Sequence, residues 1–317
     1  MRAIGVQEYG GPEALVEIDL EPEELGGQDV RIAVVAAAVS PTDTVLRSGA
    51  RAEGPRAPDV ADVPGMDVVG RVTDVGDDIG ERDGEWISVG DRVMGVVIPS
   101  GQHGAYRTDL VLPADSVCSV PNGASDAAAS TLPMNGLTAW LALDALDLAA
   151  GDVLAVTGAA GAFGGYVVQL ALTRGLRVVA DASEADRELV AGLGAHEVVE
   201  RGAGFADAVR ALHPDGVAGL ADGSVQGPEA LGAVRDGGAV ATVRGWEGDG
   251  TRDIRVHPVM VRDAARRRDL LEQLRRLVET GDLTLRVADV LPAAQAAEAH
   301  RRLEAGGVRG RLVLDFA

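Results

Sequence analysis

At 317 residues the chain is longer than one typical domain, so two domains with ample apolar core are the first expectation. Its formal charge of −20 repels nucleic-acid phosphates and anionic lipid, which excludes both as expected partners. No apolar run approaches the roughly 20 residues of a membrane helix, and the start MRAIGVQEYGGPE lacks the order of a secretory signal, so we expect a cytoplasmic protein.

The first third of the chain is predicted to be an irregular, mainly β domain. It is rich in valine, glycine, aspartate and proline, and short apolar segments alternate there with turn residues. The expected strands are Val30–Ala37, Asp67–Thr73, Asp91–Val97 and Ala105–Val111, and a last strand is expected in the closing VRGRLVLDFA.

From about Asp126 the pattern changes to apolar runs that alternate with helix-length amphipathic segments, which predicts a parallel sheet flanked by helices. The expected strands are Val153–Thr157, Arg177–Asp181, Glu197–Glu200, Val217–Asp222 and Ala239–Val243. Five such strands suffice for a doubly wound sheet. Apolar residues at helical spacing predict one helix over 163–174 and another over 270–278, which ends before a glycine.

The passage VLAVTGAAGAFGGYVVQLA runs from a buried-type strand through glycines into a helix. Glycines spaced three apart suit a tight turn, close approach to a pyrophosphate and close packing of the helix on the strand. The new helix also points free N–H groups and its positive dipole end at the phosphates. We therefore predict a dinucleotide site on Gly158, Ala160, Gly161, Ala162, Phe163 and Gly164. A purely structural turn is the alternative.

The choice between NADH and NADPH depends on the end of the second strand, RVVADAS. Asp181 lies twenty residues after Gly161, where a carboxylate can accept hydrogen bonds from the ribose hydroxyls, and this favours NADH. Ser183 and Arg187 could instead hold a 2′-phosphate if Asp181 turns away. Alternatively, Ser183 simply caps the helix that follows, with Asp186 in a capping-box-like position.

Beyond these local motifs, a series of weak motifs occurs in the order of a known family from residue 1 to 317. They are EYGGPE, VSPTDTVLRSG, VPGMDVVG, VGDRVMGV, GAYRTDLVLPAD, LPMNGLTAW, the glycine motif and GGVRGRLVL. The chain thus resembles the medium-chain dehydrogenase/reductases of the quinone oxidoreductase or enoyl reductase type. The resemblance implies a GroES-like substrate domain from residues 1–124 plus 286–317, a Rossmann nucleotide-binding domain over 125–285, a cleft site and a homodimer.

The zinc-dependent branch of that family would have a cysteine where Ser40 stands and a His-Glu pair where Met66 and Asp67 stand. A catalytic zinc usually needs three Cys, His or carboxylate ligands, and one aspartate cannot supply them. Cys118 is the only cysteine, and the five histidines have no metal-ligand spacing. We therefore expect no zinc.

Without a metal, positioning must bring a reduced nicotinamide and an electron-poor small molecule together, with a donor for the developing oxyanion. The resemblance places Ser40 beside the nicotinamide and Thr138 near its ribose, although Thr138 could also be a structural hydrogen bonder. Arg47 either reaches the substrate oxyanion or forms an ion pair with Asp43, four residues away. Val243 and Arg244 follow the fifth strand, at the edge where such sheets bind ligands, and Arg244 could equally point into solvent.

The expected function is thus an NADPH- or NADH-dependent, zinc-free reduction of a quinone or an α,β-unsaturated carbonyl compound. Two alternatives stay open. One is a tailoring enoyl or keto reductase of a biosynthetic pathway, which differs only in substrate. The other is a catalytically silent relative that binds the nucleotide, which the serine at position 40 permits because the family usually has asparagine there.

Overall fold

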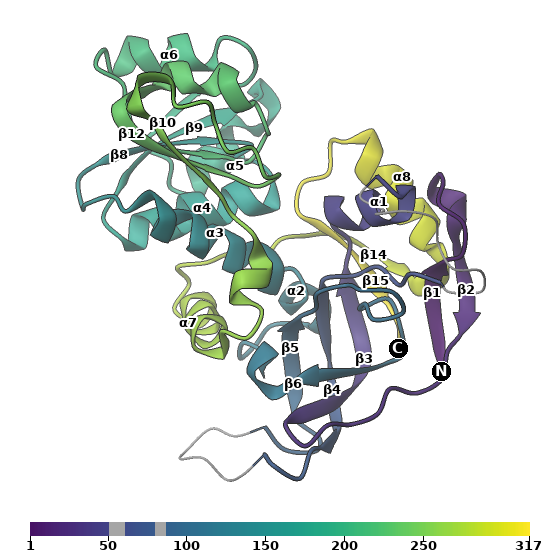
Figure 1. The fold of residues 1–317 in the computed structure, drawn as a ribbon. Helices are drawn as coiled ribbons and strands as arrows, with labels where there is room; N and C mark the ends of the chain where they lie inside the picture. The colour runs from purple at the N-terminus through teal and green to yellow at the C-terminus, as the bar shows by residue number, and fades with distance from the viewer. Residues whose placement is uncertain (51–60, 80–86) are drawn as a thin grey trace. The chain divides into compact units, whose positions relative to one another are not determined.

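The computed structural model describes residues 1–50, 61–79 and 87–317, and these form two compact units. The first unit comprises Met1–Met134, Ala265–Glu279 and Leu285–Ala317, and the second comprises Asn135–Ala264 and Thr280–Thr284. Each unit has its own sheet and is described by itself (Figure 1).

The first unit is the GroES-like domain, and its main sheet has the strand order β14-β15-β3-β4-β5-β7, with β6 paired to β3. Strands β1 and β2 form a separate antiparallel pair. The strand bounds are Arg2–Val6 (β1), Leu15–Asp19 (β2), Asp29–Ala38 (β3), Asp67–Val75 (β4), Arg92–Val96 (β5), Asp109–Pro113 (β6), Val117–Ser119 (β7), Val287–Pro292 (β14) and Arg311–Asp315 (β15). Side chains along β3 alternate between buried and half-buried, as expected of a strand with one face on a core.

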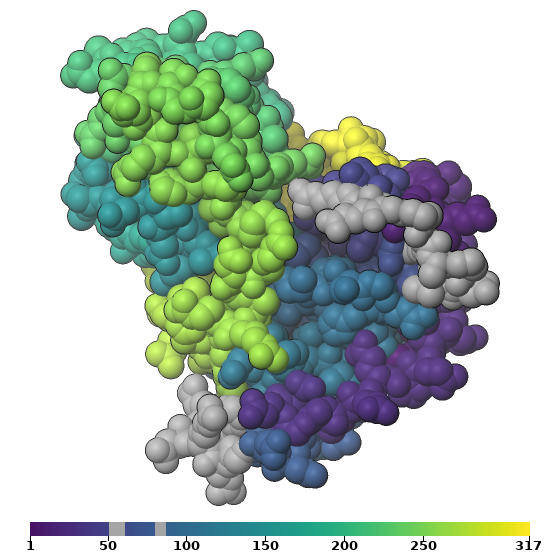
Figure 2. Space-filling view, in the orientation of Figure 1, coloured from purple at the N-terminus to yellow at the C-terminus, as the bar shows by residue number. Residues whose placement is uncertain are grey.

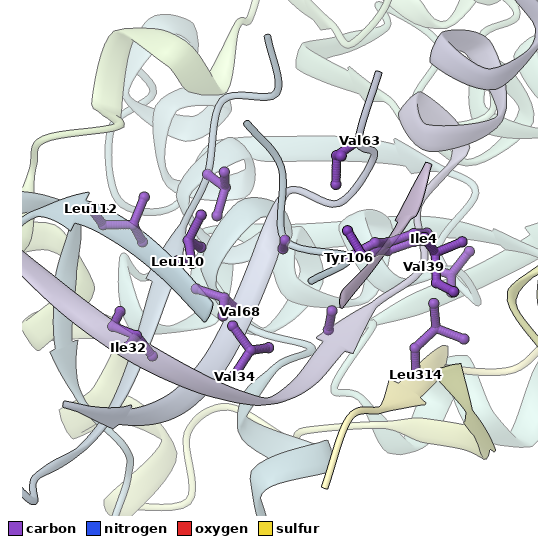
Figure 3. Close-up of a cluster of buried hydrophobic side chains, with 14 of the residues drawn as sticks. Ile4, Ile32, Val34, Val39, Val63, Val68, Tyr106, Leu110, Leu112 and Leu314 are labelled. Atoms are coloured by element: carbon purple, nitrogen blue, oxygen red, sulfur yellow. The ribbon is translucent and has the colours of Figure 1, made fainter. Parts of the chain in front are cut away.

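The core of the first unit lies between this sheet and the segments that cover it, and Figure 3 shows Ile32, Val34, Leu110 and Leu112 meeting there. The helices of the unit are Pro41–Ser48 (α1), Asp126–Ala129 (α2), Arg268–Glu279 (α7) and Ala296–Ala305 (α8). Short 3-10 turns span Pro12–Ala14 (η1), Ala114–Ser116 (η2) and Ala293–Gln295 (η7).

Two segments differ from the sequence expectation. The strand expected over Ala105–Val111 begins at Asp109, because the backbone N–H groups of Ala105 and Tyr106 donate to the carbonyls of Gly65 and Pro64 instead of to a sheet neighbour. Helix α7, expected within residues 125–285 of the nucleotide domain, packs its buried leucines against β7 and is part of the first unit.

The second unit is the Rossmann domain, a six-stranded parallel sheet in the order β10-β9-β8-β11-β12-β13. The bounds are Val153–Thr157 (β8), Arg177–Ala182 (β9), Glu197–Glu200 (β10), Val217–Asp222 (β11), Val234–Thr242 (β12) and Arg255–Pro258 (β13). Strand β12 starts five residues before its expected start, and its parallel ladder on β11 is continuous over Ala239–Thr242.

Helices lie on both faces of this sheet, with α6 on one face and α3 and α4 on the other (Figure 1). Their bounds are Pro133–Leu146 (α3), Ala162–Thr173 (α4), Arg187–Gly192 (α5) and Phe205–Leu212 (α6). Short 3-10 turns span Glu184–Asp186 (η3), Gly227–Ala233 (η4), Thr251–Asp253 (η5) and Val261–Ala264 (η6). In the described part of the chain, no helix is long and apolar enough to cross a membrane.

Candidate functional site

The glycine motif lies where the strand order of the Rossmann sheet reverses. Strand β8 is followed by the motif, and its neighbours are β9 on one side and β11 on the other. In open α/β sheets, ligands bind outside the carboxyl ends of the strands at this switch point. Gly158 follows β8 with a φ of +67°, a conformation that residues with a side chain rarely adopt.

The residues of the motif fit a bound pyrophosphate. Gly161 caps α4 without a side-chain hydrogen bond, so the first-turn N–H groups of Ala162, Phe163 and Gly164 are presented by backbone alone. A Cβ at Gly164 would lie 2.4 Å from the carbonyl oxygen of Gly158, so only glycine allows this helix to approach the strand so closely. Ala160 lies within the same turn and is half-buried.

Asp181 lies in β9 and faces the glycine motif. Its Oδ1 accepts a hydrogen bond from the backbone N–H of Ala159 at 3.0 Å. Burial raises the pKa of Asp181 above its usual value, while the hydrogen bond from Ala159 and the charge of Arg201 oppose that shift. The carboxylate therefore holds the motif in its turn, a contact that the sequence did not indicate.

The two residues considered for a 2′-phosphate both form hydrogen bonds with other groups of the second unit. The Ser183 hydroxyl donates to Oδ2 of Asp186 at 2.6 Å, at the position that caps η3. Arg187 Nη1 donates to the carbonyl of Val198 at 2.8 Å. Ser183 is thus the N-cap residue of η3, as the alternative expected, although its hydroxyl bonds the Asp186 side chain and not a backbone N–H, and Arg187 bonds a carbonyl of β10.

Arg201, a charged residue that the sequence analysis did not single out, lies at the carboxyl ends of the Rossmann strands, near Asp181. Arg201 follows β10, its backbone N–H donates to the carbonyl of Ala182 at 3.0 Å, and its side chain is exposed. Its charge is near enough to oppose the rise that burial causes in the pKa of Asp181. No sequence signal points to it, because Arg201 reaches this position only through the register of β10 on β9, which pairs Glu200 with Ala182.

A buried pair joins the ends of β8 and β11 beside the glycine turn. Thr157 Oγ1 donates to Oδ1 of Asp222 at 2.7 Å, and both residues are buried. The same hydroxyl accepts from the N–H of Ser224 at 3.1 Å. The loop after β11 is thereby held against the carboxyl end of β8.

The remaining predicted cofactor residues also lie in the second unit. Thr138 is buried in the second turn of α3 and not at the helix start. Val243 and Arg244 begin the loop after β12, which Thr242 closes by donating its hydroxyl to the carbonyl of Trp246 at 2.9 Å. Arg244 is exposed.

In the first unit, Ser40 begins helix α1 and is fully buried. Oδ2 of Asp43 accepts from the Ser40 N–H at 2.8 Å, and its Oδ1 accepts from the Gly65 N–H at 3.0 Å. The Ser40 hydroxyl contacts the hydroxyl of Thr42, which is itself exposed. Asp43 thus ties together the two loops that carry Ser40 and Met66.

Asp43 is in turn held by a buried side-chain network. Tyr106 donates its hydroxyl to Oδ2 of Asp43 at 3.1 Å and lies 3.3 Å from Nε2 of His300. Arg47 Nη1 lies 3.4 Å from Nδ1 of His300. Because arginine only donates, Nδ1 is the acceptor and the neutral ring carries its proton on Nε2, which donates to the Tyr106 oxygen. The donors therefore point in one direction, from Arg47 to the Asp43 carboxylate.

Burial dominates the titration of this network. It raises the pKa of the Asp43 carboxyl to about 6, against the hydrogen bonds from Ser40 and Gly65. It lowers the pKa of His300 to about 3, with the charge of Arg47 acting in the same direction. Figure 3 shows Tyr106 beside the core residues Ile4 and Val39. Asp43 therefore ionises above, and His300 below, its usual range.

Arg47 does not form the ion pair with Asp43 that its spacing allowed. Its guanidinium pairs with Glu304 at 2.6 Å, donates from Nε to the carbonyl of Gly10 and is almost fully buried. Figures 1 and 2 show α8, which carries Glu304, in yellow beside α1 in indigo. His300 and this pairing were missed, although Ala296, Ala299 and His300 share one buried helical face.

The residues at the family's zinc positions do not fit zinc. Both oxygens of Asp67 are engaged, Oδ1 by the N–H of Met134 at 2.7 Å and Oδ2 by Nη2 of Arg311 at 2.8 Å. Ser40 and Met66 offer a hydroxyl and a thioether, which are poor zinc ligands. Across residues 1–50, 61–79 and 87–317, no group of three or more His, Cys, Asp or Glu side chains could hold a metal ion.

Two family models match the chain. The model described as alcohol dehydrogenase GroES-like domain matches residues 26–122, and the one described as zinc-binding dehydrogenase matches residues 193–314. The second description concerns the family and not the donor set found here.

Individual relatives agree with these matches. The quinone oxidoreductase of Mus musculus is 34% identical over 62% of this chain and 57% of its own length, so the chain matches little more than half of it. The quinone oxidoreductase of Sus scrofa is 28% identical over 99% of this chain and 97% of its own length. A mycobacterial protein solved in complex with NADPH is 28% identical, has a TM-score of 0.85 and is covered over its full length by 99% of this chain.

Proposed function

Because the chain belongs to the medium-chain dehydrogenase/reductase superfamily, in its quinone oxidoreductase-like group, we propose that it is an NAD(P)H-dependent reductase of quinones or α,β-unsaturated carbonyl compounds. The observation that carries the proposal is the glycine turn at the switch point of the Rossmann sheet, with Gly164 packed against Gly158. When bound, a reduced nicotinamide supplies the hydride.

The chain's own contribution is to position the acceptor and to stabilise the developing oxygen charge. We assign the donor to the hydroxyls at the start of α1. Ser40 is buried and its hydroxyl contacts that of Thr42, whereas Thr42 is exposed and its hydroxyl donates to the thioether sulfur of Met66 at 3.0 Å. A thioether is a weak acceptor that a substrate oxygen can replace, so Thr42 presents the donor and Ser40 supports it. Thr42→Val should lower kcat with little effect on cofactor affinity, and unchanged kcat would contradict the assignment.

For the cofactor we propose NADPH as the preferred form. Arg201 supplies an exposed guanidinium at the end of β10, while Asp181 is turned toward Ala159 and does not compete for the ribose. A guanidinium close to a 2′-phosphate forms a strong charge-assisted hydrogen bond. The mycobacterial relative solved with NADPH supports the same choice.

The preference is tested by Arg201→Glu, with Kd measured by quenching of protein fluorescence. Loss of a charge-assisted hydrogen bond should weaken NADPH binding by about 10- to 100-fold and leave NADH binding nearly unchanged. Arg177→Glu is the matched control. Arg177 begins β9 and so lies at the amino ends of the parallel strands, away from the carboxyl ends where Arg201 lies, and its substitution should alter neither Kd. Equal losses for both cofactors in Arg201→Glu would contradict the assignment.

The reaction itself is tested by titrating the purified protein with NADPH and NADH, then following cofactor oxidation with a quinone and with a simple enone. Binding with turnover supports the reductase. Binding without turnover of either acceptor leaves a nucleotide-binding relative without this activity, and absence of binding to both cofactors overturns the proposal.

We also propose a homodimer. Strand β13 is the last strand of the Rossmann sheet, and a terminal parallel strand offers its outer backbone edge to a second copy. Light scattering coupled to gel filtration checks this directly, and a monomer at all concentrations would refute it.

A further inference from the structure

The loop that follows β11 contains a valine in an unusual conformation. Val225 has a φ of +59°, in the left-handed region. A β-branched side chain is a pronounced outlier there, because its Cβ substituents crowd the backbone. Its side chain is also one of the exposed large apolar groups of the described residues, at 46% of its full exposure.

The surroundings hold this conformation in place. Asp222 Oδ1 accepts from the N–H of Gln226 at 3.1 Å, and Oδ2 accepts from the N–H of Gly227 at 2.8 Å. On the other side of Val225, the Ser224 N–H donates to Thr157. The residues on both sides of Val225 are therefore fixed by one buried Thr-Asp pair, so the loop cannot relax by rotating only Val225.

Such strain persists only where the surrounding structure over-determines it, and it concentrates at ligand-binding positions. Here the loop also touches the cofactor motif. A Cβ at Gly158 would lie 3.0 Å from the carbonyl carbon of Gly223, and a Cβ at Gly223 would lie 2.9 Å from the ring of Phe163. The exposed, strained valine thus stands two residues from a backbone segment packed on the glycine turn.

Strand order decides which half of a dinucleotide meets this loop. The pyrophosphate belongs at the glycine turn after β8, and the adenosine ribose belongs at the end of β9, on one side of it. The other half must extend over the opposite neighbour, β11. The loop that carries Val225 follows β11 directly.

Building on the proposed function, we infer that Val225 is a cofactor-positioning residue whose apolar side chain packs on the nicotinamide-ribose half of the bound dinucleotide. The strain is retained because it presents a branched apolar side chain where glycine or asparagine would suit the backbone better. The contact orients the nicotinamide half and does not contribute to binding of the adenosine half.

The test compares two ligands on wild type and Val225→Gly, using isothermal titration with NADPH and with adenosine 2′,5′-bisphosphate, which represents the adenosine half alone. Loss of a half-buried valine contact should weaken NADPH binding about fivefold or more and leave the bisphosphate unchanged. Because glycine relieves the strain, the melting temperature of the free protein should rise by about 3 °C. The expected variant is therefore more stable and binds its cofactor more weakly.

Two further variants separate contact from flexibility. Val225→Asn keeps a residue that tolerates the left-handed region, and it should lose NADPH affinity as the glycine variant does. Val290→Gly is the matched control, because Val290 is 44% exposed but lies in the extended strand β14 of the other unit. It should lower the melting temperature and leave both affinities unchanged.

The outcomes are distinguishable. Unchanged NADPH affinity in Val225→Gly, equal losses for both ligands, or a lowered melting temperature would each overturn the assignment of Val225. If wild type binds neither NADPH nor NADH, the proposed function itself fails.

Discussion

His300 allows a quantitative test of the buried network in the first unit. The ring is fully buried, and burial together with the Arg47 charge lowers its pKa to about 3. At pH values between the ordinary histidine pKa and this lowered value, the unfolded chain binds a proton at His300 and the folded protein does not. Stability from this residue is therefore complete above the unfolded pKa and is lost as the pH falls toward the folded one.

The size of the effect follows from the two pKa values. Each unit of difference between the folded and unfolded pKa corresponds to about 1.4 kcal/mol in the free energy of unfolding. When the pH falls from about 7 to about 4.5, it passes through about two of the units that separate the two pKa values. Wild type should thus lose about 2.5 kcal/mol on this account. Asp43 acts in the opposite direction, because its raised pKa of about 6 adds stability as the pH falls.

The measurement is urea unfolding of wild type and His300→Gln at both pH values, followed by circular dichroism. Glutamine cannot titrate, while the Asp43 contribution is common to both proteins, so the stability difference between them isolates the imidazole. That difference should shrink by about 2.5 kcal/mol at the lower pH. Tyr106→Phe, which removes the hydroxyl between His300 and Asp43 but keeps the imidazole, is the control and should keep the loss of stability at low pH that comes from His300. A difference that does not change with pH would refute the buried, neutral ring.

Two further substitutions test the packing of each unit. Gly164→Ala should destabilise the protein by about 1–3 kcal/mol and weaken NADPH binding, because the added Cβ would meet backbone atoms of Gly158. Gly192 is a helical glycine with open space around it, so Gly192→Ala is the control and should be neutral or stabilising. Thermal melts and cofactor titrations compare the two variants. Asp67→Asn should destabilise by about 3–5 kcal/mol because it leaves the buried Arg311 cation without its carboxylate, and the double variant Asp67→Leu/Arg311→Met should be closer to wild type. A double variant as unstable as the sum of its single substitutions would show that the ion pair is not coupled.

The Rossmann strands were the most predictable part of the fold. The structure confirms Val153–Thr157, Glu197–Glu200 and Val217–Asp222 with the expected bounds. Strands of a parallel sheet are covered on both faces and therefore appear in the sequence as short continuous apolar runs. The first unit was harder because its loops are also apolar: Ala105 and Tyr106 are as buried as a strand but donate their hydrogen bonds to the loop at Pro64 and Gly65.

The cofactor motif could be located because it is local in sequence, whereas its supports are not. Gly158, Gly161 and Gly164 occur in seven residues. Arg201 reaches the same edge only through the pairing of β10 with β9, and Asp222 only through the pairing of β11 with β8. Sequence spacing carries no information on either pairing, so these residues had no signal of their own.

Side-chain type also does not reveal whether a group is already engaged. Ser183, Arg187 and Arg47 have the chemistry expected of an anion or oxyanion site, yet each forms hydrogen bonds with groups of its own unit. Val225 is the reverse case, because valine suggests core while the backbone holds it exposed and strained. A ligand contacts the groups that the fold leaves available. The hydrogen-bond partners of a charged residue and the φ of an apolar one therefore decide its role in this site more than its residue type does.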